Sequence, residues 1–418
     1  MGKGLLPLLL VQKFGGSSVA TAHHIAEVAR KIQQAVEAGH QVVVVASAMG
    51  DSTDHLVDLA GQLVAIPSGR EMDALLSTGE LVTVALLAMT LEQNGVPARS
   101  FSGGQAGIKT SYDFGRARIE AIDPGPLRRA LAAGITPVVA GFQGVTGSGD
   151  VATLGRGGSD LTAIALAGAL KADRCEIYSD VAGVYTADPR SVPNATPLSS
   201  LSYDEMLELA SQGAQVLQTQ AVEYAKGHQV VIHARSTFLD EPGTQIEAEP
   251  VIAVKPAVTA VALNRHVAKI GLLGVPDYPG VAAYLFSSLA NHGINVELVI
   301  QSLSHDKLND IAFTISEHDV PKAKPIVQEC LIHLKGQSVI IDDKVAKVSA
   351  VGSGMLGRPG VAATLFQALA DAGINIQMIG TSEIKISCIV DRSDADRALE
   401  HIHHAFGLDG TEDVIEDD

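Results

Sequence analysis

Apolar residues in the first 245 positions follow two alternating spacings. Residues 41–46 form a continuous apolar run after Gln41, which predicts a strand buried on both faces. Residues 19–38 instead carry apolar side chains every three or four positions, which predicts a helix. Further strands are predicted at 8–13, 136–140, 176–179 and 230–233, and further helices at 161–170 and 203–211. This alternation predicts a doubly wound α/β fold, a three-layer αβα domain over residues 1–245.

The alternation stops after this predicted domain. Residues 240–244, DEPGT, have the composition of a turn, and the stretch up to Pro256 is interrupted by prolines. We therefore expect a linker and a strand over residues 246–264.

Beyond the linker, one pattern occurs twice. Residues 279–283, PGVAA, and 293–295, GIN, recur about 80 positions later, and about half of the positions in this window are identical. Each copy predicts a strand, a Pro-Gly turn, a helix, a second strand, and then strand, helix and strand. The first strands are expected at 269–273 and 347–351, and the second strands at 294–300 and 374–379. This βαββαβ order is ferredoxin-like, and it is expected over residues 265–343 and 344–418; two purely structural modules are the alternative.

Composition narrows the class of protein. The chain has 418 residues, too many for one core, so two or three domains are expected. Aromatic residues make up 4% and Trp is absent, which favours sheets covered by helices over a β-sandwich. The formal net charge of −17 argues against a nucleic-acid or anionic-membrane partner. An anionic small molecule would bind where the scarce cations stand beside glycines, helped by helix N-termini and a divalent metal.

The cysteines and the first residues indicate a cytoplasmic protein. Cys175, Cys330 and Cys388 lie far apart, without metal-binding spacing, and are expected to be small buried residues in a reducing compartment. The apolar residues 5–11 are too few for a membrane helix and run into a predicted strand, so no signal peptide is expected.

The first candidate site is Lys13-Phe14-Gly15-Gly16-Ser17-Ser18, between a predicted strand and helix. Glycines let a ligand approach the backbone, a helix start offers free N–H groups to an anion, and Lys13 adds a positive charge. A tight turn is the alternative. The chain contains no GxxxxGK[ST] pattern, so it is not a P-loop protein.

The second candidate site is Leu154-Gly155-Arg156-Gly157-Gly158-Ser159-Asp160, after the Gly-rich residues 144–149. Arg156 suits a carboxylate, which it can hold with two hydrogen bonds. Asp160 could orient a lysine ammonium group or a metal-bound water. Two anion sites on one sheet indicate phosphoryl transfer onto an acidic acceptor, which depends on positioning and charge neutralisation.

Three further segments have weaker signals. Residues 178–190 follow a predicted strand end, where open α/β sheets bind ligands, although a capped surface loop is the alternative. Residues 47–53 and 77–80 have the composition of ordinary helix N-caps.

Taken together, these segments resemble the aspartate kinases of the amino acid kinase superfamily. VQKFGGSSVA, SAMGDSTD, LSTGE, AGFQG, TLGRGGSDLTA and EIYSDVAGVYTADPR occur in that family's order, and the duplicated copies look like its paired ACT modules. The resemblance covers nearly the whole chain. It implies transfer of the ATP γ-phosphate to the β-carboxylate of L-aspartate, with ATP and Mg²⁺ as cofactors and no metal-ligating side-chain cluster. The product, 4-phospho-L-aspartate, opens the route to lysine, threonine, methionine and isoleucine.

The resemblance also implies roles for individual residues. Lys13 would stabilise the transferring phosphoryl group, and Asp160 would organise it. The aspartate site would consist of Ser47, Thr53, Glu80, Phe142, Arg156, Gly157, Gly158 and Ser159. ATP would contact Lys13, Phe14, Gly15, Gly16, Ser179, Asp180, Val184, Tyr185, Asp188, Arg190 and Gln215.

For the ACT modules, the resemblance implies feedback by lysine, threonine or both, bound at an interface between subunits. The matching effector positions are Asp277, Pro279, Gly280, Val281, Ala282, Asn295, Val296, Glu297, Gln301, Asn375, Ile376, Ser382 and Glu383. The assembly would be a homodimer or an α2β2 tetramer formed through these modules.

Two positions depart from the family pattern. Gln215 stands where the family usually has a lysine that reaches ATP, which predicts weaker nucleotide binding or a substitute cation nearby. Gly380 stands where a serine is common, which bears on the effector response. Two alternatives therefore remain open at this point: another kinase of the superfamily, acting on glutamate, carbamate or a nucleotide, and an amino-acid sensor that has lost activity.

Overall fold

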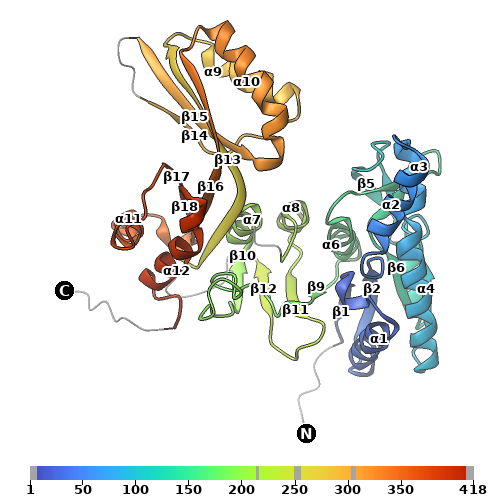
Figure 1. Cartoon of the computed structure of the whole chain (residues 1–418). Helices are drawn as coiled ribbons and strands as arrows, with labels where there is room; N and C mark the ends of the chain where they lie inside the picture. The colour runs from blue at the N-terminus through green and yellow to red at the C-terminus, as the bar shows by residue number, and fades with distance from the viewer. Residues whose placement is uncertain (1–6, 213–215, 249–255, 303–306, 411–418) are drawn as a thin grey trace. The chain divides into compact units, whose positions relative to one another are not determined.

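The computed structural model describes residues 7–212, 216–248, 256–302 and 307–410, and the chain forms two compact units (Figure 1). The first unit comprises residues 1–184, 197–210 and 215–251. The second unit comprises residues 185–196, 211–214 and 252–418.

The first unit is organised around an eight-stranded sheet. In spatial order its strands are β10 (Ser200–Ser202), β12 (Thr244–Glu247), β11 (Ile232–Ser236), β9 (Arg174–Ser179), β1 (Leu9–Phe14), β2 (Gln41–Ala46), β6 (Thr136–Ala140) and β3 (Ala98–Phe101). Neighbouring strands are parallel except β11 and β12, which are antiparallel. The predicted α/β fold is confirmed, and each predicted strand of the first domain is present within two residues at its start.

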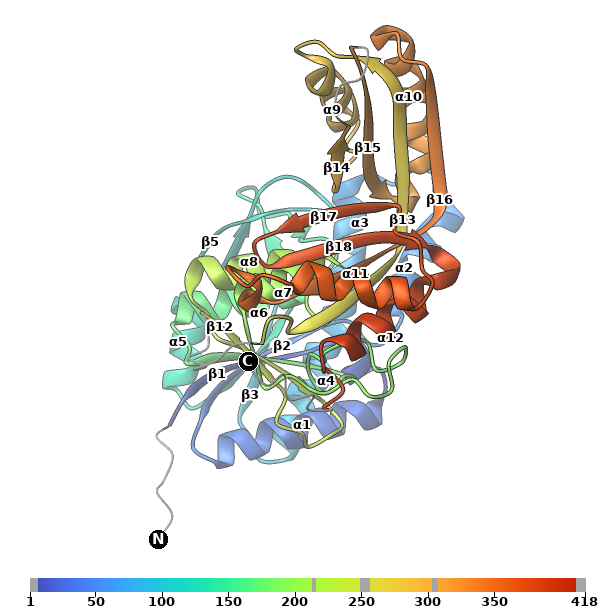
Figure 2. The ribbon, with the colours of Figure 1, turned by 90° about the vertical axis from the view of Figure 1, so that its left-hand side faces the viewer.

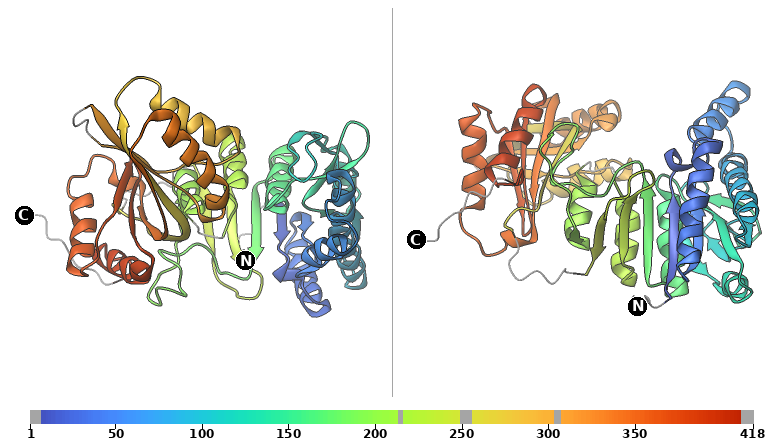
Figure 3. Two further views of the ribbon diagram at one scale, coloured as in Figure 1. Left: turned by 45° about the horizontal axis from the view of Figure 1, so that its top comes forward. Right: turned by 90° about the horizontal axis from the view of Figure 1, so that it is seen from below.

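Helices cover both faces of this sheet (Figure 3). The described helical elements of the first unit are the 3-10 turn η1 (Ser17–Val19) and the helices α1 (Ala22–Glu37), α2 (Ser52–Leu63), α3 (Gly69–Leu76), α4 (Thr78–Gln93), α5 (Gly125–Ala132), α6 (Gly158–Leu170), α7 (Tyr203–Ser211) and α8 (Thr219–His228), of which α3 packs against β8 (Val151–Thr153) of a smaller sheet. The predicted helix over 19–38 begins later, at Ala22, because the Thr21 hydroxyl accepts a hydrogen bond from the His24 N–H at 3.2 Å and caps the helix there.

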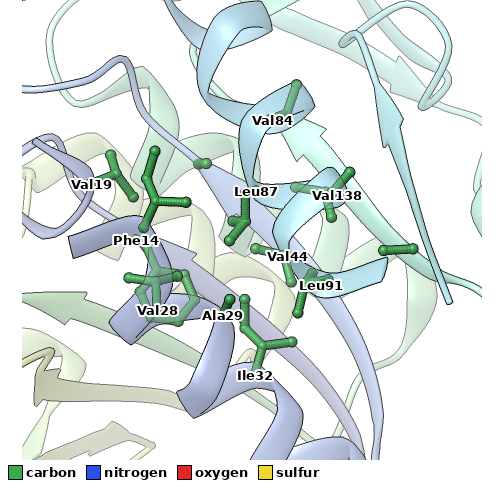
Figure 4. Packing of buried hydrophobic residues seen from close by; sticks show 14 of the residues in the cluster. Phe14, Val19, Val28, Ala29, Ile32, Val44, Val84, Leu87, Leu91 and Val138 are labelled. Atoms are coloured by element: carbon green, nitrogen blue, oxygen red, sulfur yellow. The ribbon is translucent and has the colours of Figure 1, made fainter. Parts of the chain in front are cut away.

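The main core of the first unit determines which way β1 presents its side chains. Phe14 packs with Val28 of α1, Val44 of β2 and Leu87 of α4 (Figure 4). Because successive side chains of a strand point to opposite faces, Lys13 points to the other face, where α6 packs.

A second, four-stranded sheet of the first unit was not predicted. Its order is β5 (Ile119–Ile122), β4 (Ile108–Thr110), β7 (Gln143–Val145) and β8 (Val151–Thr153). The Gly-rich residues 144–149 connect β7 and β8 as an antiparallel hairpin. This hairpin leads directly into the second glycine-rich segment.

The second unit contains one six-stranded antiparallel sheet. Its order is β14 (Val299–Gln301), β15 (Leu308–Ser316), β13 (Ala260–Pro276), β16 (Ser338–Val351), β18 (Lys385–Asp391) and β17 (Met378–Ser382). Its helices are α9 (Val281–Asn291), η2 (Glu317–Asp319), α10 (Val320–Leu334), η3 (Ser353–Met355), α11 (Val361–Asp371), η4 (Arg392–Asp394) and α12 (Ala395–Ala405). Figure 2 shows α9 and α10 beside β13, β15 and β16, and α11 and α12 beside β17 and β18.

The two repeats share their longest strands. β13 runs for 17 residues, pairs with β15 over residues 267–276 and pairs with the start of the second repeat over residues 260–264. The expected second strands at 294–300 and 374–379 are wrong in their starts, since β14 begins at Val299 and β17 at Met378. Before β14, an irregular bond from the Glu297 N–H to the Thr314 carbonyl, 2.9 Å, takes the place of a regular ladder.

Residues 185–196, which we term the strap, come from the catalytic part of the sequence but fold with the second unit. Ala187 and Val192 are buried in the core that also contains residues of α11 and α12. The Thr186 carbonyl accepts a hydrogen bond from the Val261 N–H at 2.7 Å, and the Thr186 hydroxyl is bonded to His403 Nε2 at 2.8 Å. The strap is thus an integral part of the second unit's core.

One helical stretch of the described residues, 69–93, is long and apolar enough by composition to cross a membrane, and 44% of its apolar window is buried in the protein. Its residues Val84, Leu87 and Leu91 belong to the main core of the first unit. We therefore interpret it as a core helix.

Candidate functional site

The site is centred on an ion pair between β1 and α6. Lys13 Nζ lies 2.6 Å from Asp160 Oδ1, and each side chain is 11% exposed. Lys13 reaches this position because it points away from the α1 core, and Asp160 because it lies in the first turn of α6. Because one carboxylate holds the nearly buried Lys13 ammonium group in place, this group is directed at a ligand that binds beside it.

Glycines keep the space beside Lys13 open. A Cβ added to Gly15 would lie 3.3 Å from Lys13 Nζ, and one added to Gly16 would lie 3.2 Å from the Ala48 carbonyl oxygen. The glycines lead into the turn η1 and not directly into α1, so the expected helix start at this loop is wrong. The second glycine loop does open a helix: Gly157, with φ of 74°, immediately precedes α6.

Arg156 is the exposed cation of that second loop. It lines the same cavity as Lys13, and within the described part of the chain it has no ion-pair partner. In a protein of net charge −17, an unpaired guanidinium in a cavity is suited to an anionic ligand.

Glu80 lies in the first turn of α4 and is 3% exposed. The Ala48 N–H donates to its Oε1 at 3.2 Å, while Oε2 has no hydrogen-bond partner among the described residues. Burial raises the pKa of the Glu80 carboxyl to about 7. A buried carboxylate oxygen without a partner is suited to a cationic group of a ligand.

Phe142 has a positive φ of 67°, which is uncommon for a bulky residue. Its N–H donates to Thr162 Oγ1 of α6 at 3.1 Å, and its carbonyl accepts from the Leu154 N–H at 2.9 Å. These two bonds hold it in the strained conformation, a situation that is frequent at functional sites.

The structure brings all predicted catalytic and acceptor residues together around one cavity of about 280 Å³. Its lining is Lys13, Gly16, Ser47, Ala48, Gly50, Thr53, Glu80, Phe142, Gly155, Arg156, Gly157, Gly158, Ser159 and Asp160. The cavity therefore combines two cations, two carboxylates, hydroxyl groups and the start of α6. A volume of this size suits a small amino acid or the end of a phosphate chain.

The predicted nucleotide residues are not brought together in the same way. The Phe14 side chain packs against Tyr178, with ring centroids 4.8 Å apart, on the core side of the sheet, so the expectation that it contacts ATP is wrong for its side chain. In the first unit, Ser179 ends β9 and Asp180 and Val184 follow it, and Val184 is 2% exposed. Tyr185, Asp188 and Arg190 lie in the strap, and Gln215 lies outside the described residues.

Arg190 and Asp188 are paired with each other. Arg190 Nη2 lies 2.8 Å from Asp188 Oδ2, and Arg190 Nε lies 3.0 Å from Asp188 Oδ1. The hydrogen bond from Arg190 is the largest cause that holds the pKa of the Asp188 carboxyl below its ordinary value. This carboxylate is therefore already satisfied by the guanidinium.

A second cavity, of about 130 Å³, lies in the first repeat of the second unit. Of the predicted effector residues it is lined by Asp277, Gly280, Val281, Ala282 and Gln301. Pro279, Asn295, Val296, Glu297, Asn375, Ile376, Ser382 and Glu383 are not part of its lining. Glu297 instead forms an ion pair with the buried Lys347 of β16.

Sequence reasoning missed several residues of the second cavity and a buried carboxylate of the first unit. Asn309 lines the second cavity, is 6% exposed, and has no hydrogen-bond partner for its Oδ1 among the described residues. Asp73 of α3 is 1% exposed and accepts a hydrogen bond from the Thr153 N–H, three residues before Arg156. Neither residue belongs to a glycine-rich or repeated pattern, so no signal in the sequence distinguishes them from ordinary polar positions.

Two protein-family models match this chain. A model described as the amino acid kinase family matches residues 9–234, and one described as an ACT domain matches residues 271–331 and 348–406. The first model covers the strands and helices that surround the Lys13 cavity, and the second covers most of both repeats.

Individual relatives match over almost the full length. The aspartokinase of Mycolicibacterium smegmatis is 48% identical over 412 residues, which cover 97% of this chain and 98% of that protein. The crystal structure of E. coli aspartokinase III in complex with aspartate and ADP (R-state) has a TM-score of 0.77 and 26% identity, and covers 95% of this chain and 99% of that one. The same enzyme in complex with lysine and aspartate (T-state) has a TM-score of 0.74 at the same identity and coverage.

Proposed function

This chain belongs to the aspartokinases of the amino acid kinase family, and from that premise we propose which of its residues perform each part of the reaction. An aspartokinase transfers the γ-phosphate of ATP to the β-carboxylate of L-aspartate and forms 4-phospho-L-aspartate. This phosphotransferase step begins the biosynthesis of lysine, threonine, methionine and isoleucine.

Aspartate binds in the Lys13 cavity with its charged groups matched by opposite charges. Glu80 Oε2, which is buried and has no hydrogen-bond partner within the described part of the chain, receives the α-ammonium group. Arg156 binds the α-carboxylate through its planar guanidinium. Ser47, Thr53 and Ser159 supply hydroxyl groups to the remaining oxygens, and Phe142 closes one side of the cavity. The E. coli enzyme, whose structure contains aspartate and ADP, supports an acceptor and a nucleotide bound together.

Lys13 neutralises the charge that is shared by the acceptor carboxylate and the transferring phosphoryl group. Asp160 holds the Lys13 ammonium in place through their 2.6 Å contact. Gly15 and Gly16 leave room for phosphate oxygens beside the ammonium. No side-chain nucleophile is required, because the acceptor carboxylate attacks phosphorus directly and ADP leaves.

Mg²⁺ fits the donor groups of this cavity. Among the described residues, no group of three or more His, Cys, Asp or Glu side chains is placed to hold a metal. Mg²⁺ bound to a nucleotide needs only one or two carboxylates besides phosphate oxygens and water. Asp160 is the carboxylate of the cavity that would hold it, and the ion would supply further neutralisation of phosphate charge.

The remaining ATP contacts come from Ser179, Asp180, Val184 and the strap residues Tyr185, Asp188 and Arg190. Gln215 offers no charge to the phosphates, so this chain binds the nucleotide with one cation fewer than the family pattern.

The observation that carries the proposal is the convergence of Lys13, Asp160, Glu80 and Arg156 on one cavity. Its test is the trapping of the acyl phosphate with hydroxylamine, using aspartate, ATP and Mg²⁺. We expect a hydroxamate with aspartate and none with glutamate or carbamate, and no ADP release when a nucleotide is the acceptor. Absence of turnover would favour the alternative of a sensor without activity, and turnover with another acceptor only would reject the acceptor assignment.

The ACT repeats act as the feedback sensor. The E. coli enzyme is known in complex with lysine, and the cavity at Asp277, Gly280 and Gln301 supports an amino-acid effector here. We expect lysine, threonine or both to lower activity by stabilising one of two states of the enzyme. Activity and thermal stability measured with each amino acid test this, and no effect of either amino acid on both quantities would refute it.

We infer assembly through the ACT repeats, as a homodimer or an α2β2 tetramer. Light scattering of the protein with and without effector distinguishes the two. All three cysteines are free and buried, which supports a place in the reducing cytoplasm.

A further inference from the structure

Asp73 is a buried carboxylate that uses both of its oxygens to bind Thr153 of the small sheet and Gly115 of the segment between β4 and β5. Its Oδ2 accepts hydrogen bonds from the Thr153 N–H at 2.8 Å and from the Gly115 N–H at 2.9 Å. Its Oδ1 accepts from the Thr153 hydroxyl at 2.8 Å. Among the described residues it has no ion-pair partner, and it is 1% exposed. A carboxylate is retained in such a place when its hydrogen bonds are complete, as they are here.

The groups that Asp73 holds lie at the base of the Arg156 loop. Thr153 is the last residue of β8, and Leu154, Gly155 and Arg156 follow it directly. Gly115 touches the same loop, since a Cβ added to Gly155 would lie 3.2 Å from the Gly115 carbonyl oxygen. The Asp73 carboxylate therefore fixes both the end of β8, where the Arg156 loop begins, and the backbone at Gly115, which the loop contacts.

Asp73 also belongs to the helical stretch that carries Glu80. The Ser77 N–H donates to the Asp73 carbonyl at 3.0 Å, and the Ser77 carbonyl accepts from Gln143 Nε2 of β7 at 2.9 Å. α4 begins at Thr78, so that Glu80 lies in its first turn. The helical turn from Asp73 to Ser77, which precedes α4, is thus bonded to the small sheet at both of its ends.

From these contacts we propose that Asp73 is a positioning residue of the acceptor site, which sets the separation between Glu80 and Arg156. This inference rests on the proposed roles of these two residues in aspartate binding. That separation has to match the ammonium and carboxylate groups on the α-carbon of aspartate, and holding both groups fixes where the β-carboxylate lies. Asp73 touches neither substrate, so it acts only through the Arg156 loop and the α3–α4 junction.

Two substitutions test this role, with steady-state kinetics of the full chain in the hydroxylamine assay. Asp73→Asn places an amide where a carboxylate oxygen accepts N–H groups, and Thr153→Val removes only the hydroxyl donor. We expect the KM for aspartate to rise about tenfold or more for Asp73→Asn, because small displacements of positioned groups have large effects, and about threefold for Thr153→Val. The KM for ATP should stay within about twofold, because neither contact reaches Lys13 or the glycines beside it. Asp123→Asn, at an exposed carboxylate that accepts from the Gly125 N–H, is the matched control and should change neither constant.

The results separate the possible outcomes. If Asp73→Asn and Thr153→Val lower only the melting temperature, or raise both KM values equally, the role is structural and the inference is wrong. Thr153→Val keeps the test valid if Asp73→Asn does not fold. Arg156→Lys is measured in parallel. If Arg156→Lys leaves the KM for aspartate unchanged, the proposed role of Arg156 fails. If Arg156→Lys raises that KM while both other variants leave it unchanged, only the inference about Asp73 fails.

Discussion

The predicted acceptor residues of this protein all lie in one unit, whereas the predicted nucleotide residues are divided between two. Lys13, Glu80, Arg156 and Asp160 line a single cavity whose walls are the buried elements β1, α4 and α6. Tyr185, Asp188 and Arg190 instead lie in the strap, which folds with the ACT repeats. The predicted acceptor residues are thus placed by the core of one unit, whereas three of the predicted nucleotide residues belong to a segment that folds with the other unit.

The largest effect is expected at the centre of the cavity. Lys13→Met removes the charge next to the transferring phosphoryl group, and kcat should fall by about 10²–10³, the effect of losing one donor to transition-state charge. Lys109→Met, at an exposed position of β4, is the control. A fall of less than about tenfold would assign the neutralising role to another group.

Arg156→Lys tests the carboxylate end of the acceptor site. It keeps the charge but loses the planar pair of donors, so the KM for aspartate should rise about tenfold to a hundredfold while the KM for ATP changes little. Arg118→Lys, whose side chain is 83% exposed, should have no effect. Equal changes in the KM for aspartate and the KM for ATP would show that the acceptor residues and the nucleotide residues are not separate sites.

Glu80→Gln tests the ammonium end through its pH dependence. Because the pKa of the Glu80 carboxyl is raised to about 7, the empty site gains its negative charge as the pH rises, and the KM for aspartate should fall between about pH 6 and pH 8. Glu80→Gln should abolish this dependence and raise the KM about tenfold at pH 8. Glu92→Gln, on the exposed face of the same helix, should keep the profile of the unsubstituted enzyme.

The same carboxyl affects stability in a defined direction. Between its pKa in the unfolded chain, near 4.5, and its raised pKa in the folded protein, the folded protein binds more protons. The free energy of unfolding contributed by Glu80 therefore decreases as the pH rises through this range. We compare the melting temperatures of ligand-free Glu80→Gln and of the unsubstituted protein. The melting temperature of the variant minus that of the unsubstituted protein should increase from pH 5 to pH 8. A constant difference would contradict the raised pKa.

The smallest expected effect is at the nucleotide end. Gln215→Lys restores the family's usual cation and should lower the KM for ATP about threefold to tenfold, with the KM for aspartate unchanged. Gln220→Lys, an exposed position of α8, controls for added charge. If the KM for ATP does not move, Gln215 does not account for nucleotide affinity.

Local patterns in the sequence were enough for the elements that carry the site. The valine run of β2, the strand before Lys13 and the helix after Gly157 follow directly from hydrophobic spacing and glycine placement. The ten predicted catalytic and acceptor residues meet at one cavity, because most of them follow the ends of neighbouring strands or begin the helices that pack against them.

Features that depend on distant contacts could not be predicted in this way. The Phe14 side chain faces the core, because alternation along β1 places it opposite to Lys13. Phe14 also belongs to a motif associated with ligand binding, and the expectation that it contacts ATP came from that motif. β14 and β17 begin later than the apolar pattern indicates, because backbone bonds to Thr314 and Ile389 precede each regular ladder. The hydrogen-bond partners of Asp73, Gly115 and Thr153, are 42 and 80 positions away in the sequence, so no local pattern indicates them.

The strap also determines where the chain can be divided. A break at the linker near residue 250 would follow the order of the sequence, yet it would leave Ala187 and Val192 without the apolar side chains that surround them. It would also remove the partner of the Thr186 hydroxyl and the backbone donor at Val261. The ACT half, expressed without residues 185–196, would in turn have a gap in its core. To separate the two halves, or to exchange them between relatives, the strap has to be moved together with the repeats. The second unit is therefore encoded by two separate stretches of the sequence.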